Sequence, residues 1–258
     1  MSSASQAVQA AIHVRGIRLT NVGMEDALNA IDAALASGNP ARIAFVNADC
    51  VNLAARDEGY RDSLEAMDWI FVDGIGMRLA GWILEQNIRD NVNGTDLFPK
   101  LCAELAMRGR SLFLLGAKPG VAAAAADWAR AHHPGLRIAG AEDGYFPESA
   151  SPEVARRIRQ ARPDVLLVAM GAPRQEHWIA RHAAAAGATV TLGVGGLFDY
   201  YSGNIPRAPG WMRRAGLEWV FRLIQEPGRL WKRYLVGNFS FLLRIAGDRV
   251  RLFCGRKP

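Results

Sequence analysis

Short apolar runs alternate with longer segments of helical periodicity between residues 42 and 196. The apolar runs cover residues 42–47, 69–73, 111–116, 136–142, 164–170 and 188–196. Nearly continuous apolar runs of this length are typical of strands that are buried on both faces of a parallel sheet. The segments between them, such as 49–67 and 121–133, have the length and spacing of helices. The pattern predicts a doubly wound, mainly parallel α/β domain over residues 10–203.

The pattern changes after Gly203, where helical periodicity replaces the strand-like runs. One helical face of residues 216–226 gathers four apolar side chains, which are Leu217, Val220, Phe221 and Ile224. Pro227 and Gly228 should end that helix, and two further short helices are expected after them. We therefore predict a C-terminal helical appendage over residues 204–258.

Charge is distributed unevenly between these two parts. Residues 207–258 hold 12 Lys and Arg, 3 Asp and Glu, and eight aromatic residues, whereas residues 1–206 hold 19 basic and 22 acidic residues. A basic, aromatic helical segment either packs as a cap on the sheet or lies on an anionic membrane surface, and both interpretations stay open. Because the sheet domain is net acidic, we also expect the appendage to complete any site for an anionic ligand.

Composition narrows the class of protein. Half of the 258 residues are hydrophobic, and no run approaches 18 apolar residues, so we expect a packed core and no membrane span. The three cysteines, Cys50, Cys102 and Cys254, are odd in number and far apart, which favours a reducing, cytoplasmic location. The five histidines match no zinc motif and no Asp-x-Asp pair is present, so we expect no metal site.

The strand-like run 69–73 ends on Asp73, and a Gly-x-Gly turn follows at once. Asp73 could cap the next helix, or it could be a catalytic group at the carboxyl end of a strand, where doubly wound, Rossmann-like sheets bind ligands. Asn47 follows the preceding strand, and Asn93 and Thr95 lie in a Gly-containing loop. Taken singly, Asn47 and Thr95 fit helix caps better than ligand contacts, but together these residues could share a cleft.

Three further strand ends carry candidate binding residues. Gly116 and Lys118 lie in a small-residue loop before a helix, which suits either phosphate binding or a plain turn. Gln175 lies in a first helical turn, and Gly195 lies in a glycine-rich strand end. These loops predict a nucleotide-type ligand. A nicotinamide-dependent oxidoreductase is one alternative, and the absence of a Gly-x-Gly-x-x-Gly motif argues against it. A nucleic-acid-binding protein that uses the basic tail is the other alternative.

Eight motifs in order carry a resemblance to a known family. They are NAD, DGIG, NGTDLFP, LFLLGAKPG, GYF, GAPRQEHW, GVGGLFDYYSG and the Arg- and Trp-rich segment 207–238. From about residue 15 to residue 250, the chain resembles the WecG/TagA/CpsF glycosyltransferases of family 26. The resemblance implies an inverting, metal-independent hexosyl- or N-acetylmannosaminyltransferase without a cofactor. It implies a UDP-sugar donor, a polyprenyl-diphosphate-linked saccharide acceptor and a role in surface polysaccharide synthesis.

The resemblance also implies roles for particular residues. Asp73 matches the general base, and Asn47 and Gln175 match residues that contact donor and acceptor. Arginines of the appendage are implied to contact the diphosphate, most naturally Arg222 and Arg229, with Lys232 and Arg233 nearby. The expected partners are the two substrates and an anionic membrane surface at the cytoplasmic face of the plasma membrane. No nucleic acid is expected, and a homo-oligomer is possible.

Two positions depart from the family pattern. Phe45 stands where many members have Thr, and Asn91 stands where many have Arg. Both positions are implied to touch substrate, so the sequence leaves the donor sugar open.

Overall fold

The structure is a computed structural model that describes residues 11–254, and the side chains of Arg229 and Arg233 lie outside the described part. Its centre is an eight-stranded sheet of order β1-β2-β4-β3-β8-β7-β5-β6. The strands are β1 (Ala11–Val14), β2 (Ile17–Thr20), β3 (Ala41–Val46), β4 (Trp69–Val72), β5 (Ser111–Gly116), β6 (Arg137–Glu142), β7 (Val165–Ala169) and β8 (Val190–Gly193). All neighbouring strands are parallel except β1 and β2. The predicted α/β fold is therefore confirmed, and the β1–β2 hairpin at its edge is an addition.

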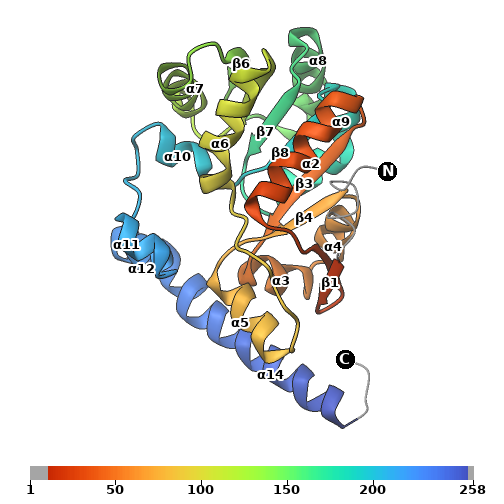
Figure 1. Ribbon diagram of the computed structural model, residues 1–258, viewed down its shortest axis with the longest axis vertical. Helices are drawn as coiled ribbons and strands as arrows, with labels where there is room; N and C mark the ends of the chain where they lie inside the picture. Colours follow the sequence, from red (N-terminus) through yellow and green to blue (C-terminus); the bar gives the residue numbers. More distant parts are fainter. Residues whose placement is uncertain (1–10, 255–258) are drawn as a thin grey trace.

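Helices cover both faces of the sheet (Figure 1). The first face packs against α2 (Met24–Ser37), α6 (Gly94–Met107), α7 (Val121–His132) and α10 (Leu197–Tyr201). The second packs against α3 (Ala48–Ala54), α4 (Glu58–Glu65), α8 (Ser151–Ala161) and α9 (Arg174–Ala186), and a short 3₁₀ turn, η1 (Glu148–Ala150), precedes α8. Along β3, Ile43 and Phe45 enter the first core and Ala44 and Val46 enter the second. Such two-sided burial explains the continuous apolar runs in the sequence.

The segment 49–67 differs from its prediction as one helix. It forms two helices, because the Asp57 carboxylate accepts a hydrogen bond of 2.9 Å from the Tyr60 backbone N–H and starts α4 anew. Both helices pack on the second face of the sheet.

The C-terminal segment contains α11 (Gly210–Arg214), α12 (Glu218–Gln225), α13 (Pro227–Trp231), a π-helical stretch η2 (Lys232–Gly237) and α14 (Asn238–Phe253). The break at Pro227 is confirmed, since Glu226 leaves the helical region between α12 and α13. The prediction of two further short helices is wrong, because residues 227–253 stay helical throughout. Proline is tolerated at the first position of a helix, so Pro227 ends α12 and begins this longer segment.

Helix α14 lies along α5 (Ile75–Ile83) beneath the sheet (Figure 1). Phe241 and Ile245 of α14 are fully buried in the second core, and Asp248 pairs with Arg15 of the β1–β2 turn at 2.5 Å. The segment is thus packed onto the sheet and its helices. Within residues 11–254, no helix is both long enough and apolar enough to cross a membrane.

Candidate active site

Asp73 follows the last residue of β4 at the carboxyl edge of the sheet. Its backbone N–H donates to the Val46 carbonyl at 2.9 Å, which extends the β3–β4 pairing one residue past the end of β4. The next residue, Gly74, has φ of +91° and occupies the N-cap position of α5. A left-handed φ of this kind favours glycine, so the Gly-x-Gly sequence serves a turn that other residues would strain. Gly74, which directly follows Asp73, therefore occupies the N-cap position of α5.

Asn47 lies next to this turn. A Cβ atom added to Gly74 would lie 4.0 Å from the Asn47 Cβ. The Asn47 side-chain oxygen accepts hydrogen bonds from the backbone N–H groups of Asp49 and Cys50 at 3.1 and 3.2 Å, which confirms Asn47 as the cap of α3. The structure therefore brings Asn47 and Asp73 together at the ends of two adjacent strands.

The loop before α6 braces the same turn. The Asn91 side-chain oxygen accepts a hydrogen bond of 2.6 Å from the Gly74 backbone N–H. Asn93 caps α6, since its oxygen accepts from the Asp96 backbone N–H at 2.7 Å and its amide donates to the Asp96 carboxylate at 2.8 Å. The expectation that Thr95 is a cap is wrong, because Thr95 lies inside the first turn of α6. Its carbonyl accepts a hydrogen bond of 2.6 Å from the Tyr201 hydroxyl.

The two departures from the family pattern have different surroundings. Phe45 is buried, and a Cβ atom added to Gly94 would lie 3.5 Å from its ring. Asn91 holds the turn that carries Asp73, as described above. Phe45 therefore packs against the start of α6, and Asn91 holds the turn after Asp73 through its hydrogen bond from Gly74.

Gln175 joins two loops at the centre of the sheet edge. Its side-chain oxygen accepts hydrogen bonds from the backbone N–H groups of Gly171, at 3.2 Å, and Gly195, at 2.9 Å. Its amide donates to the Glu176 carboxylate at 2.8 Å. Gln175 is 4% exposed, so the contacts in the structure are those of an internal brace, and its predicted contact with substrate stays a prediction.

Glu176 is an ionisable residue whose burial was not predicted from the sequence. It is 0% exposed, and burial raises its pKa to about 7, although the hydrogen bond from Gln175 opposes the shift. Its Oε2 atom is buried without a hydrogen-bond partner among the described residues. A carboxyl group in such surroundings favours its neutral form. The Gln-Glu pair carries no local signal that its second residue is buried, because both residue types can occupy an exposed first turn.

The loops after β5 and β6 approach each other closely. Gly116 has φ of +137°, and an added Cβ would lie 2.3 Å from the Ala169 carbonyl oxygen of β7. The Gly144 backbone N–H donates to the Ala117 carbonyl at 2.9 Å. Gly116 is therefore required for packing, whereas Lys118 is exposed in the same loop. Their predicted contacts with substrate stay predictions.

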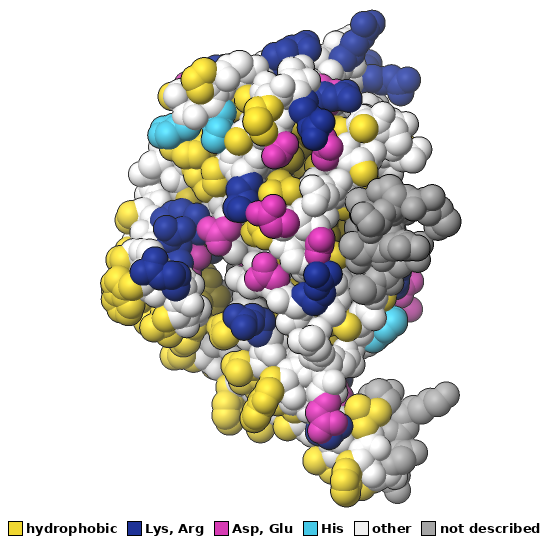
Figure 2. Space-filling model, in the orientation of Figure 1, with side chains coloured by type: hydrophobic (Ala, Val, Ile, Leu, Met, Phe, Trp, Pro, Cys, Tyr) yellow, Lys and Arg dark blue, Asp and Glu magenta, His cyan; other side chains and the backbone are white. Residues whose placement is uncertain are grey.

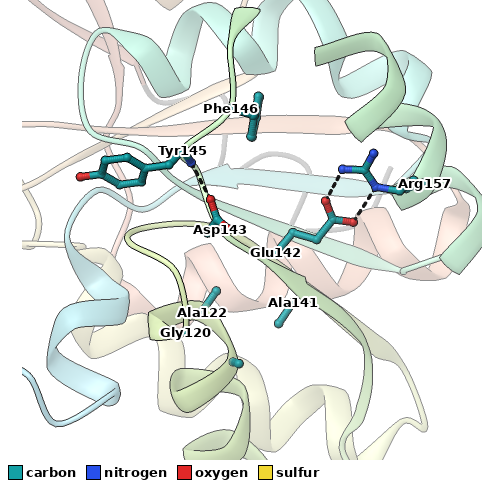
Figure 3. Close-up of a pocket in the computed structure, with 9 residues that line it drawn as sticks. Gly120, Ala122, Ala141, Glu142, Asp143, Tyr145, Phe146 and Arg157 are labelled. Carbon is teal, nitrogen blue, oxygen red and sulfur yellow. Dashed lines mark hydrogen bonds and ion pairs between the residues drawn. The ribbon is translucent and has the colours of Figure 1, made fainter. Parts of the chain in front are cut away.

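A pocket of about 370 Å³ opens beside these loops (Figure 3). Its lining includes Gly120, Glu142, Asp143, Tyr145, Phe146 and Arg157. Glu142 pairs with Arg157 through two hydrogen bonds of 3.1 and 2.6 Å, and Asp143 accepts from the Tyr145 backbone N–H at 2.8 Å. The Tyr145 ring is 67% exposed, and it points away from the Glu142–Arg157 pair in Figure 3. The polar sequence after the run 136–142 could have indicated this pocket.

Arg222 is the appendage cation that the structure places at the sheet edge. Its guanidinium lies 5.1 Å from the centroid of the Tyr200 ring. One of its nitrogen atoms would lie 3.5 Å from a Cβ added to Gly196, so it borders the Gly195–Gly196 turn. Lys232 is exposed, with its ammonium 5.6 Å from the Trp231 ring centroid. The predictions for Arg229 and Arg233 concern side chains outside the described part of the structure.

An ion-pair cluster ties the segment after α10 to α6. Arg207 contacts Asp96 at 2.9 Å and Glu218 at 3.4 Å, and Arg213 contacts Asp96 at 3.5 Å. Burial alone would raise the pKa of Asp96, but the hydrogen bond from Asn93 and the two arginines outweigh it and lower this pKa. The cluster holds α11 and α12 against the start of α6.

The candidate residues are spread along one edge of the sheet. Asp73 follows β4, Gly195 follows β8, and the pocket lies beyond β6. With strands about 4.8 Å apart, β4 and β8 are roughly 10 Å apart, and β8 and β6 roughly 14 Å. The edge is therefore long enough for an extended ligand with several chemical groups. Within the described residues, no three His, Cys, Asp or Glu side chains lie together in a way that could hold a metal ion.

Comparison with known proteins decides which enzymes share this arrangement. Residues 12–254 match the model of the glycosyl transferase WecG/TagA/CpsF family. The chain belongs to this family. It is also 36% identical over 193 residues to an N-acetylglucosaminyldiphosphoundecaprenol N-acetyl-beta-D-mannosaminyltransferase of Bacillus subtilis (strain 168), covering 75% of this chain and 74% of the relative. A protein of the same name from Bacillus spizizenii is 35% identical over 182 residues, or 70% of each chain.

Membership of the WecG/TagA/CpsF family identifies the chain as a glycosyltransferase of cell-surface polysaccharide synthesis. The family match runs through both the sheet and the C-terminal helices as far as α14. The alternatives of a nicotinamide-dependent oxidoreductase and a nucleic-acid-binding protein are therefore set aside.

Proposed function

We propose that the enzyme transfers a sugar from a UDP-sugar to a saccharide joined through a diphosphate to a polyprenol, with Asp73 as the general base. Both Bacillus relatives are named for transfer to a sugar-diphosphate-undecaprenol. The observation that carries the proposal is the position of Asp73, at the carboxyl edge between two braced loops. The turn is held by Val46 on one side and by Asn91 on the other.

The reaction is a single displacement with inversion. An acceptor hydroxyl attacks the anomeric carbon of the donor, the bond from that carbon to the UDP oxygen breaks, and the hydroxyl proton passes to the Asp73 carboxylate. A general base within hydrogen-bonding distance of the attacking hydroxyl typically increases the reaction rate by roughly 10²- to 10⁴-fold. Asn47 is adjacent to the turn and would hold a sugar hydroxyl through its side-chain NH₂ group, since its side-chain oxygen caps α3.

The donor nucleotide would extend from the pocket beyond β6 toward Asp73. The Asp143 carboxylate and the Tyr145 ring give this pocket groups that suit a ribose and a base, because carboxylates bind ribose hydroxyls and aromatic rings stack on bases. The diphosphate would then reach the Gly195–Gly196 turn, where Arg222 supplies positive charge without a metal. Arg229, Lys232 and Arg233 add positive charge to the same segment of sequence.

The acceptor's lipid requires contact with a membrane, and α14 offers a suitable surface. Apolar or small side chains recur along the solvent face of η2 and α14 at alternating spacings of three and four residues, at Val236, Phe239, Leu243, Ala246, Val250 and Phe253. The opposite face is the buried one, with Phe241 and Ile245 in the core. Arg244 and Arg251 are exposed beside the apolar stripe. A helix with an apolar outer face and flanking arginines is suited to the interface of an anionic bilayer.

The experiment is a transfer assay that follows UDP release. UDP-N-acetylmannosamine is the first donor to test, since both relatives are named for that sugar, followed by other UDP-sugars with short-chain polyprenyl-diphosphate saccharides. Asp73→Asn should lower turnover by at least roughly 100-fold with little effect on folding. Asp68→Asn is the matched control, because Asp68 precedes the same strand at its other end and pairs with Arg42. Near wild-type turnover of Asp73→Asn would remove Asp73 from its proposed role.

A further inference from the structure

Helix α5 of the sheet domain exposes a large apolar face. Trp82 is 80% exposed and Leu79 is 41% exposed, and the two are neighbours on one side of the helix. The opposite side is the buried one, where Met77 and Ala80 are fully covered by the second core. Core packing therefore accounts for one side of α5 and leaves Trp82 without a structural reason to be apolar.

This face is continuous with the apolar surface of the C-terminal helices. Helix α5 lies along α14, and Figure 2 shows hydrophobic side chains gathered where these helices run together and over α11 and α12. Arg78 is exposed beside Leu79 on α5, while the acidic Glu85 that follows the helix is paired with Arg249. The rim of the α5 surface is therefore cationic next to its apolar centre.

We propose that α5 is a second membrane contact, in which Trp82 and Leu79 enter the headgroup layer of an anionic bilayer next to α14. Tryptophan favours this layer because its ring is apolar and its indole N–H stays near water. The exposed Arg78 would meet anionic headgroups, where each basic residue contributes attraction. The part of the inference that concerns catalysis rests on the proposed function, whereas the membrane contact does not.

The position of α5 in the chain gives this contact a role in the reaction. The helix begins directly after Gly74, and Trp82 lies eight positions after Gly74 in the sequence. At a rise of 1.5 Å per residue, Trp82 lies about 12 Å along the helix from the turn that carries Asp73. A saccharide and a diphosphate likewise separate the reacting hydroxyl of the acceptor from its lipid. Docking α5 on the bilayer would therefore set the distance of Asp73 from the membrane surface.

The test compares Trp82→Glu with Met107→Glu in the full-length enzyme. Met107 is 73% exposed at the end of α6, before the amino end of β5, and so provides a matched loss of an exposed apolar side chain away from α5. Co-sedimentation is measured with vesicles of equal parts phosphatidylcholine and phosphatidylglycerol. Trp82→Glu should weaken binding about tenfold, the factor expected for one large apolar side chain leaving an apolar environment. Met107→Glu and Trp82→Phe should bind as the wild type does.

Transfer is then measured with a long-chain acceptor in those vesicles and with a short-chain acceptor in water. Trp82→Glu should lose activity toward the first and keep it toward the second. Equal loss with both acceptors, or unchanged vesicle binding, would overturn the proposal. A change from dimer to monomer in sedimentation without vesicles would also overturn it, by assigning the face to a second copy. A wild type inactive with every donor would refute the proposed function, while vesicle binding would still decide the α5 contact.

Discussion

The buried carboxyl group of Glu176 should make the stability of the enzyme depend on pH. Its pKa is raised from an ordinary value of 4.5 to about 7, mainly because burial disfavours the charged form. The folded state therefore holds a proton that the unfolded chain releases at lower pH. Stability from this group is fully present below about pH 4.5 and is lost as the pH rises toward 7.

The magnitude follows from the same two values. Each pKa unit corresponds to about 1.4 kcal/mol, so the full effect is about 3 kcal/mol of unfolding free energy. Glu176→Gln removes the titration and keeps the shape of the neutral acid, and its carbonyl can still accept from Gln175. Relative to the wild type, this variant should gain about 2 to 3 kcal/mol between about pH 5 and about pH 8.

Urea unfolding followed by tryptophan fluorescence at both pH values measures this difference. Glu65→Gln, an exposed glutamate on α4, is the control and should show the wild-type dependence on pH. If the difference between Glu176→Gln and the wild type changes by less than about 1 kcal/mol over this range, Glu176 is ionised in the folded protein and the argument from burial is wrong.

Three further predictions concern the sheet edge and the appendage. Arg222→Ala should reduce transfer to a soluble acceptor at least about tenfold, as measured by UDP release, because Arg222 borders the Gly195–Gly196 turn. The variant should keep most of its vesicle binding in co-sedimentation. Unchanged transfer would contradict the assignment of Arg222 to the diphosphate. Gly116→Ala should lower the free energy of unfolding in urea by about 3 kcal/mol, because its Cβ would lie 2.3 Å from the Ala169 carbonyl oxygen. Gly109→Ala is the control and should cost only about 1 kcal/mol, because Gly109 has φ of +62° and open space around it. Equal costs for the two variants would refute the steric argument. Activity should persist in EDTA, and recovery of a lost activity on adding Mg²⁺ or Mn²⁺ would reveal a metal requirement.

The strands of the sheet could be predicted from sequence because burial on both faces leaves an apolar run that no exposed element shares. All six predicted runs became strands of the parallel sheet. The hairpin β1–β2 was missed because its strands are four residues long and lie at an edge, where polar positions such as His13 and Arg18 interrupt the pattern. The split between α3 and α4 was missed because one capping residue, Asp57, overrides a continuous helical pattern.

The sequence by itself determined the fold class, the family and the position of Asp73 at a strand end, because each depends on local pattern and on motifs in order. Only the tertiary structure decided which polar groups meet there. In the folded chain, the Asn91 side-chain oxygen accepts a hydrogen bond from Gly74, and the Gln175 side chain is buried and accepts one from Gly195. The side chain of Glu176 is buried next to Gln175. The tertiary structure also left Trp82 on the surface while its neighbour Gly81 is buried. These outcomes depend on contacts between residues far apart in the chain, and such contacts are fixed only when the elements pack together.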